Sequence, residues 1–314
     1  MNKEEMNNFL VEVYDTHKAN GDVNAVITKY EKQYKYVYFY NDMCAKHILT
    51  GNNDLSLVTD LANAALRLTG SDCISNPTLE NPAIGGGLVH KDIEHDIFLN
   101  IPRKDADGKK LPGDRIGIEF QHVGYDVYNN RLLFYVARDV SNSLLKGDFY
   151  DKMPCVHLIS FQMFDYKPWK TSQKYIHTVR YQDDEQSPFS DRQSITIVEV
   201  GKFLKHADTD FANDSSRIAQ WLRAIDTLNS NGDYTPFASD AIFSRLQKYA
   251  EMSTFMPELF IEDGKNMRDT AEVLAYIARK EERNAKIIAE QGQTIAEQAR
   301  KIAELEAKLA ENCK

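Results

Sequence analysis

The chain has 314 residues, 42% of them hydrophobic, and a formal net charge of −9. This length and composition predict a substantial buried core, organised as one main domain with an added C-terminal element. There is no run of about 18 apolar residues and no basic start followed by an apolar stretch, so we expect a cytoplasmic protein without a membrane segment. The four cysteines lie far apart, which argues against a zinc site or a disulfide framework.

The first part of the chain is expected to be helical. Apolar residues recur at helical spacing over 4–34, with an interruption at 19–22, and further helices are expected near 42–49 and 55–68. Asp42 stands at the start of one of these helices. It has two candidate roles, as a helix cap or as a further carboxylate for the site that follows along the chain.

Two strands, at about 94–101 and 115–121, are predicted to pair across a polar turn at 102–114. Side chains alternate faces along a strand, so Glu119 and Gln121 are expected on the same side of the second strand. The pairing therefore brings an acidic residue of the first strand towards a carboxylate and an amide of the second.

The first strand offers several acidic residues for this position. Asp92, Glu94 and Asp96 follow one another at a spacing of two, so the register of the strand decides which of them faces the site. Asp96 is preferred because the apolar run follows it directly, and Glu94 is the alternative. The same alternation predicts that His95 faces away from the side of Asp96.

Two carboxylates held close together repel each other, and a bound divalent cation is the usual remedy. Asp96 and Glu119, with a backbone carbonyl near Phe120, are therefore predicted to bind Mg²⁺ or Mn²⁺.

The rest of the main domain reads as alternating strands and helices. A helix is expected at about 132–145, and Arg131 and Tyr135 lie one turn apart where it begins. Arg131 is expected either to touch phosphate or to pair with a core carboxylate, and the pairing is slightly favoured. The remaining predictions are strands at 155–162, 174–181 and 194–200 and helices at 215–229, at 239–252 and from 268 onward. Strands enclosed by helices predict a layered α/β core.

A basic and aromatic segment at 166–182 contains no acidic residue. Its basic residues alternate with tyrosines and a tryptophan, a mixture suited to phosphate contact and base stacking. A hairpin with inward-packed aromatics and solvated lysines explains the same pattern equally well. The predicted nucleic-acid contacts are Lys167, Trp169, Lys170, Lys174 and Arg180.

The last 44 residues change to a seven-residue repeat. Such a repeat predicts a coiled coil and self-association, although a solvated single helix remains the alternative because the companion positions are partly polar. The repeat is carried by Leu274, Ile288, Ile295, Ile302 and Leu309.

Several segments together resemble a known family. After Asp96 and the Glu119-x-Gln121 pair, the chain has an arginine, a tyrosine, a glycine and a tyrosine in the family's order, and a late strand ends in a similar E-x-x-K-F. These later residues are Arg131, Tyr135, Gly147, Tyr150, Glu199, Lys202 and Phe203. In these residues the chain resembles the PD-(D/E)xK nuclease superfamily, in its branch of recombination-promoting nucleases and transposase-related proteins. The resemblance covers roughly residues 36–225.

The resemblance implies a restriction-endonuclease-like mixed sheet flanked by helices, and a metal-dependent endonuclease that hydrolyses DNA. Gln121 occupies the place where related nucleases keep a lysine. An uncharged amide can orient water or phosphate by hydrogen bonds but cannot neutralise developing negative charge. The resemblance also connects the chain with mobile-element recombination or with defence against foreign DNA.

These observations predict four regions. They are an N-terminal helical extension (1–35), a nuclease-like domain (36–230), a helical extension (231–270) and a coiled-coil tail (271–314). The competing interpretation is a nuclease fold with weak catalysis that acts as a DNA-binding or oligomeric interaction protein. Retention of Asp96, Glu119 and Gln121 argues against it, since an abandoned site gains stability by losing clustered carboxylates.

Overall fold

The computed structural model describes residues 1–51, 54–85, 91–104, 107–122, 124, 127–164, 169–270 and 291. It divides into two units. The first consists of Met1–Met6 and Ile27–Met256, and the second of Asn7–Val26 and Pro257–Lys314. The predicted coiled coil at 271–314 lies outside the described residues, apart from residue 291.

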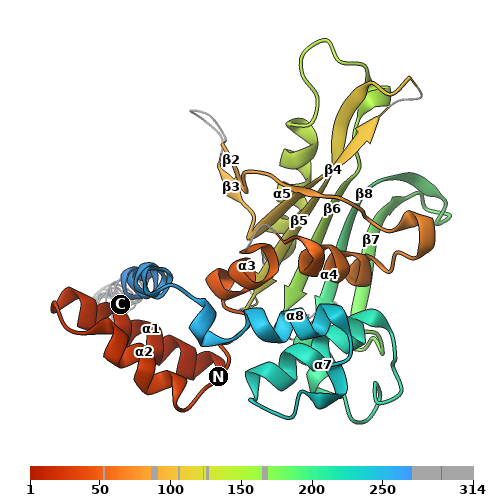
Figure 1. Ribbon diagram of the computed structural model, residues 1–314. Coiled ribbons are helices and arrows are strands. Elements are labelled where there is room, and N and C mark those ends of the chain that lie inside the picture. The colour runs from red at the N-terminus through yellow and green to blue at the C-terminus, as the bar shows by residue number, and fades with distance from the viewer. Residues whose placement is uncertain are drawn as a thin grey trace, which may run out of the picture. The chain divides into compact units, whose positions relative to one another are not determined.

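Six strands of the first unit form one mixed sheet (Figure 1). Their order across the sheet is β1-β4-β5-β6-β8-β7, with β5, β6 and β8 parallel to one another and the other neighbours antiparallel. The strands are β1 (Thr78–Leu79), β4 (Ile97–Lys104), β5 (Lys110–Gln121), β6 (Val156–Gln162), β7 (Ile176–Gln182) and β8 (Pro188–Glu199). A separate two-stranded ribbon pairs β2 (Ala83–Ile84) with β3 (Ile93–Glu94).

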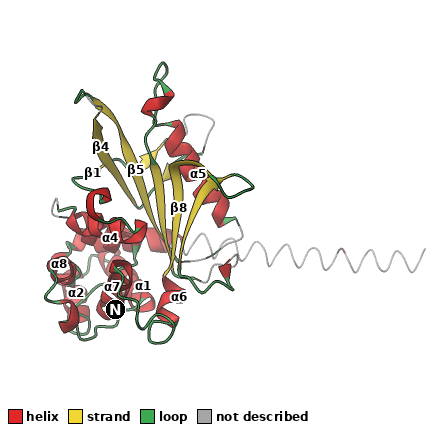
Figure 2. Cartoon of the chain, turned by 90° about the vertical axis from the view of Figure 1, so that its right-hand side faces the viewer, coloured by secondary structure: helices red, strands yellow, loops and turns green. Residues whose placement is uncertain are grey.

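Helices cover both faces of the sheet (Figure 2). Helix α5 (Tyr128–Ser141) connects β5 to β6 and packs on β6 and β8, while α4 (Ser56–Leu66) lies on the other face of the same strands. Strands covered on both sides must be apolar along their whole length, and Val156–Phe161 is largely apolar for this reason. The predicted mixed α/β sheet flanked by helices is confirmed.

Three more helices of the first unit are close to the predicted ones, namely α3 (Asp42–Thr50), α7 (Arg217–Asn229) and α8 (Ala241–Tyr249), and a fourth is α6 (Val200–Lys205). Helices α7 and α8 pack on α4, with the Trp221 and Phe243 rings in edge contact at 5.4 Å. The short helix α6 was not predicted, because six residues directly after a strand are too few to show a helical period.

The expected polar turn at 102–114 is wrong. Strands β4 and β5 continue through most of this segment, so that Arg103 pairs with Leu111 and Lys104 with Lys110. The described residues in this part of the β4–β5 hairpin are exposed or half-buried. Exposed strands can pair through their backbones while carrying polar side chains, and this explains the polar composition.

The second unit contains most of α1 (Lys3–Lys18), the start of α2 (Val23–Glu31) and a helix at 257–270. Phe9 and Phe260 meet edge to face with ring centroids 4.8 Å apart, and Arg268 forms an ion pair with Asp15. The predicted break in the N-terminal helix is confirmed between α1 and α2. Among the described residues, no helix is both long and apolar enough to cross a bilayer.

Candidate active site

The pairing of β4 with β5 places Asp96 beside Glu119. Ile97 pairs with Ile118, so Asp96, one residue before β4, lies across from Glu119. The backbone N–H of Phe120 donates to Asp96 Oδ2 at 2.6 Å and holds the carboxylate against β5. Glu94 belongs to the separate ribbon and is exposed, so the structure places Asp96, not Glu94, at this position.

The Asp96 carboxyl group lies among like charges. Burial raises the pKa of Asp96 well above its usual range, and the carboxylates of Glu119 and Asp42 raise it further. The Phe120 N–H and the charge of Arg131 act in the opposite direction. Residue Asp96 as a whole is half-buried.

Asp42 is the first residue of α3 and is exposed. The cap of this helix is Asn41, whose side chain accepts the backbone N–H of Cys44 at 3.0 Å. Since capping is performed by its neighbour, the electrostatic influence of Asp42 on Asp96 is the observation that connects it with the site.

Glu119 is almost fully buried. Its Oε1 lies 3.0 Å from Nδ1 of His95, and its Oε2 accepts a hydrogen bond from Arg131 Nη2 at 3.1 Å. Two cationic partners thus hold the carboxylate on opposite sides. A carboxylate has about four lone-pair positions, so both oxygens retain capacity for a further ligand.

The prediction that His95 faces away from the side of Asp96 is wrong, because its ring contacts Glu119. Strand β3 ends at Glu94 and β4 begins at Ile97, so the alternation of faces is interrupted at His95. The imidazole lies fully buried between two carboxylates, with Nε2 3.1 Å from Asp139 Oδ2 on α5 and Nδ1 towards Glu119. Burial alone would lower the pKa of His95, but the bonds to Asp139 and Glu119 raise it to about 9.

Arg131 connects the two polar residues of the motif. Besides its bond to Glu119, it donates from Nη1 to Gln121 Oε1 at 3.4 Å, and its guanidinium lies over the Tyr135 ring with its Cζ 5.0 Å from the centroid. The slightly favoured pairing with a core carboxylate is therefore present. Its side chain is 33% exposed, so part of it also reaches solvent. Burial and the charge of Glu119 raise the pKa of Tyr135.

A glycine makes room for the His95 ring. A Cβ at Gly117 would lie 2.7 Å from the Cε1 and Nδ1 atoms of His95 and 2.9 Å from Leu158 Cδ1. The first contact is with a ring held at both nitrogens, so it cannot turn aside without losing a carboxylate partner.

We expect Gly117→Ala to lower the free energy of unfolding by about 1–3 kcal/mol, because the added methyl overpacks a closed site. Urea denaturation measures the change. Gly51→Ala is the control, since its Cβ would meet no atom closer than 3.8 Å. Equal stability of the two variants would mean that His95 is not held against β5.

A second polar cluster lies on β8 and α6. Glu199 is fully buried, and its Oε2 accepts from Lys202 Nζ at 2.8 Å and lies 3.2 Å from His177 Nε2. Lys202 also donates to the backbone carbonyls of Trp169, Ser172 and Lys174 at 3.1–3.3 Å. The late E-x-x-K pattern therefore anchors the basic and aromatic segment to the end of the sheet.

The predicted nucleic-acid contacts fall in different places. Lys170 and Lys174 are exposed on the anchored segment, whereas the Trp169 ring is partly buried and stacks on His177 at 4.1 Å. Trp169 also packs against the hydrophobic core. Lys167 lies outside the described residues.

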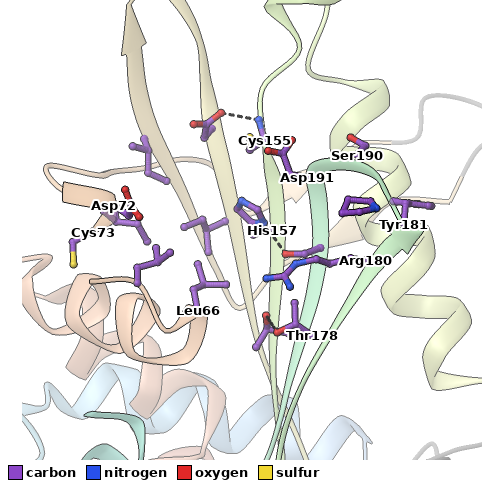
Figure 3. A pocket seen from close by; sticks show the side chains of 18 of the residues that line it. Leu66, Asp72, Cys73, Cys155, His157, Thr178, Arg180, Tyr181, Ser190 and Asp191 are labelled. Carbon is purple, nitrogen blue, oxygen red and sulfur yellow. Dashed lines mark hydrogen bonds between the residues drawn. The ribbon is translucent and has the colours of Figure 1, made fainter. Parts of the chain in front are cut away.

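Arg180 lies on the opposite face of the sheet from Glu119. It lines a cavity of about 600 Å³ together with His157 and Asp191, beside the C-terminal end of α4 (Figure 3). His157 hydrogen-bonds Ser194 at 2.7 Å there, and burial lowers the pKa of this histidine. Lys170 and Lys174 thus lie on the segment that Glu199 and Lys202 anchor on the α5 face. Arg180 lies on the other face, so the sheet separates it from these two lysines.

The site contains the donor types that a hard divalent cation takes. Asp96, Glu119 and Asp42 offer carboxylate oxygens and Gln121 an amide oxygen, which are the ligand types that Mg²⁺ and Mn²⁺ take. Burial and, after it, the charges of Glu119 and Asp42 raise the pKa of Asp96, and a bound cation would offset these charges. Within the described ranges, no group of three or more His, Cys, Asp or Glu side chains is arranged to hold a metal ion.

A mixed sheet flanked by helices, with an acidic residue before one strand and a Glu-x-Gln on its neighbour, has the architecture of the PD-(D/E)XK nuclease class. The chain belongs to the PD-(D/E)XK nuclease family transposases, because the model of that family matches residues 39–277. No curated protein and no solved structure shows significant similarity to the chain.

Sequence reasoning missed His95 as a site residue and did not consider Asp139. Asp139 had a recognisable signal, since it falls on the buried stripe of α5 together with Leu132, Tyr135 and Val136. An acidic residue at such a position requires a buried partner. His95 had no comparable signal, because its direction depends on the interruption between β3 and β4.

Proposed function

We propose that this protein is a metal-dependent endonuclease that hydrolyses phosphodiester bonds of DNA. The observation that carries the proposal is the Asp96 carboxyl group beside the buried Glu119, within a chain of a nuclease family. A bound Mg²⁺ or Mn²⁺ supplies polarisation of the scissile phosphate and a lowered pKa for the attacking water. Asp96 and Glu119 would hold this ion, and Asp42 is the further carboxylate within electrostatic reach.

The other residues of the site have distinct roles in this proposal. Gln121 donates hydrogen bonds from its amide to water or to a phosphate oxygen. Arg131 supplies the permanent positive charge that Gln121 lacks, because its guanidinium contacts both Glu119 and Gln121 and reaches the surface. His95 and Asp139 fix the orientation of Glu119 from below, as outer partners do for ligating carboxylates.

Cleavage of supercoiled plasmid tests the proposal. We expect nicked product with Mg²⁺ or Mn²⁺ and none when EDTA is present. Bound but intact DNA under both conditions would instead support the binding-protein interpretation. One contact pattern favours that interpretation, because both Glu119 oxygens already have cationic partners and need no metal ion for charge compensation.

We expect Lys170→Ala/Lys174→Ala to weaken DNA binding to a similar degree for all sequences, because both lysines are exposed where phosphate contact is proposed. The slope of log affinity against log salt should decrease by about 0.9 for each phosphate that is no longer neutralised. Fluorescence anisotropy with a labelled duplex in EDTA measures both quantities. Lys32→Ala/Lys248→Ala removes the same charge from exposed positions elsewhere and should change neither.

The seven-residue repeat of 271–314 forms part of the proposal as a route to a homo-oligomer through a coiled coil. We expect truncation after Asp269 to lower the mass measured by light scattering to that of a smaller assembly. A full-length protein with the mass of one chain would contradict the coiled coil.

A further inference from the structure

Three residues lie side by side at the carboxyl ends of the parallel strands. Gln121 on β5 pairs in register with Gln162 on β6, and Gln162 pairs with Glu199 on β8. Residues paired in register on neighbouring strands project to the same face, at a strand spacing of about 4.8 Å. Gln162 therefore stands between the motif amide and the second polar cluster, on the face that α5 covers.

The neighbours of Gln162 have their hydrogen-bonding groups engaged. Ser160, two residues earlier on the same face, lies with its Oγ 2.8 Å from the Tyr128 hydroxyl on α5. Glu199 is held by Lys202 and His177, and Gln121 accepts from Arg131.

Gln162 differs from these neighbours. Its side chain is fully buried, and neither Oε1 nor Nε2 has a hydrogen-bond partner among the described residues. Buried polar groups are nearly always paired, and an unpaired amide is costly to the folded state. An apolar side chain at this position would fill the same space without that cost. The amide would be useful to the protein if it gained a hydrogen-bond partner in another state, such as the one with bound substrate.

Gln121 is the group on which such an amide can act. A glutamine side chain has several torsions and a broad preference at its terminal amide, and its carbonyl oxygen has two lone pairs, so it can accept a second bond beside the one from Arg131. Its bond from Arg131 is 3.4 Å long, beyond the usual range for a strong hydrogen bond. A second bond from the neighbouring strand would hold its oxygen and leave its N–H groups free to point outward.

We propose that Gln162 is a positioning residue whose amide hydrogen-bonds the Gln121 side chain when substrate binds, so that the Gln121 N–H groups point to the phosphate. This inference rests on the proposed nuclease function. It assigns the hydrogen-bonding role at the site to the amides of Gln121 and Gln162 on adjacent parallel strands. Gln121 would then have two partners, Arg131 from α5 and Gln162 from β6.

Gln162→Met tests the inference, because methionine matches the volume of glutamine and lacks the amide. We expect the midpoint of thermal unfolding to rise by a few degrees, since an unpaired buried amide is removed. At the same time, kcat for plasmid nicking should fall about 10-fold or more while KM is unchanged, as expected for an outer residue that orients a contact residue.

Gln193→Met is the matched control. Gln193 lies on the neighbouring strand β8, opposite Val156 at the other end of the paired segment of β6 and β8, and its substitution should change neither quantity in this way. A higher unfolding midpoint with unchanged kcat would overturn the inference, because the amide would then be only a cost to stability. A lower midpoint would also overturn it, since the amide would be paired in the free protein.

A second measurement separates this inference from the nuclease proposal. The side-chain amide signals of Gln162 and Gln121, assigned by their disappearance in the methionine variants, can be followed by ¹⁵N NMR in the wild type with a phosphorothioate duplex. We expect both sets to shift together on binding, and an unchanged Gln162 signal would overturn the inference. Shifted signals without plasmid cleavage would leave the amide pair in place and contradict the nuclease.

Discussion

Glu119→Ala is expected to reduce plasmid cleavage by about 10³-fold or more, the largest loss at any single position. Removing a carboxylate that holds a divalent cation costs several kcal/mol of transition-state stabilisation, and each 1.36 kcal/mol is about a factor of ten in rate. The same change leaves Arg131 and His95 without their shared partner. Nicking of supercoiled plasmid at saturating Mg²⁺ measures the rate.

Two controls separate chemistry from folding in this experiment. Glu119→Gln keeps an oxygen that accepts from Arg131 while removing the negative charge, and it should be nearly as inactive as Glu119→Ala. Circular dichroism should show the same secondary structure for the variants and the wild type. Substantial nicking by a folded Glu119→Gln would show that this carboxylate does not hold the ion.

The central strands and the pair Glu119 and Gln121 were predictable because they depend on local patterns. Apolar runs located β6 and the second half of β5 correctly, and the alternation of faces placed the two polar residues of the motif together, as their shared contacts with Arg131 confirm. The preference for Asp96 over Glu94 used the apolar run directly after it, and β4 does begin at the next residue.

The features that were missed depend on relations between distant segments. The register that aligns Gln121, Gln162 and Glu199 joins strands from three separate parts of the chain, and no local pattern specifies it. His95 enters the site because it lies between the end of β3 and the start of β4. The alternation of side-chain faces holds within one strand and does not extend across such an interruption. The polar turn was misplaced because exposed paired strands have the composition of a loop.

Because Asp139 compensates the charge of the buried His95, we expect substitutions of Asp139 to have a large effect on stability. The carboxylate is fully buried on α5, and it is one of two groups that compensate the charge of His95, whose pKa the pair raises to about 9. Helix α5 and strand β5 are thereby joined through one imidazole. A change on the helix should therefore be felt at Glu119, because the two carboxylates share the same histidine.

We expect Asp139→Ala to lower the free energy of unfolding by about 3–5 kcal/mol, because it leaves a buried charge without half of its compensation. Urea denaturation at neutral pH measures the loss. Asp151→Ala removes an aspartate from an exposed position and should change stability by less than about 0.5 kcal/mol.

Combining Asp139→Ala with His95→Ala tests whether the loss arises from this pair. If it does, the double variant is destabilised by clearly less than the sum of the single variants, since the second change removes the charge that the first one exposed. Strictly additive effects would mean that Asp139 stabilises the protein through its packing on α5 and not through His95. In that case the orientation of Glu119 would depend on Arg131 and not on the helix carboxylate, and cleavage would be insensitive to Asp139→Asn.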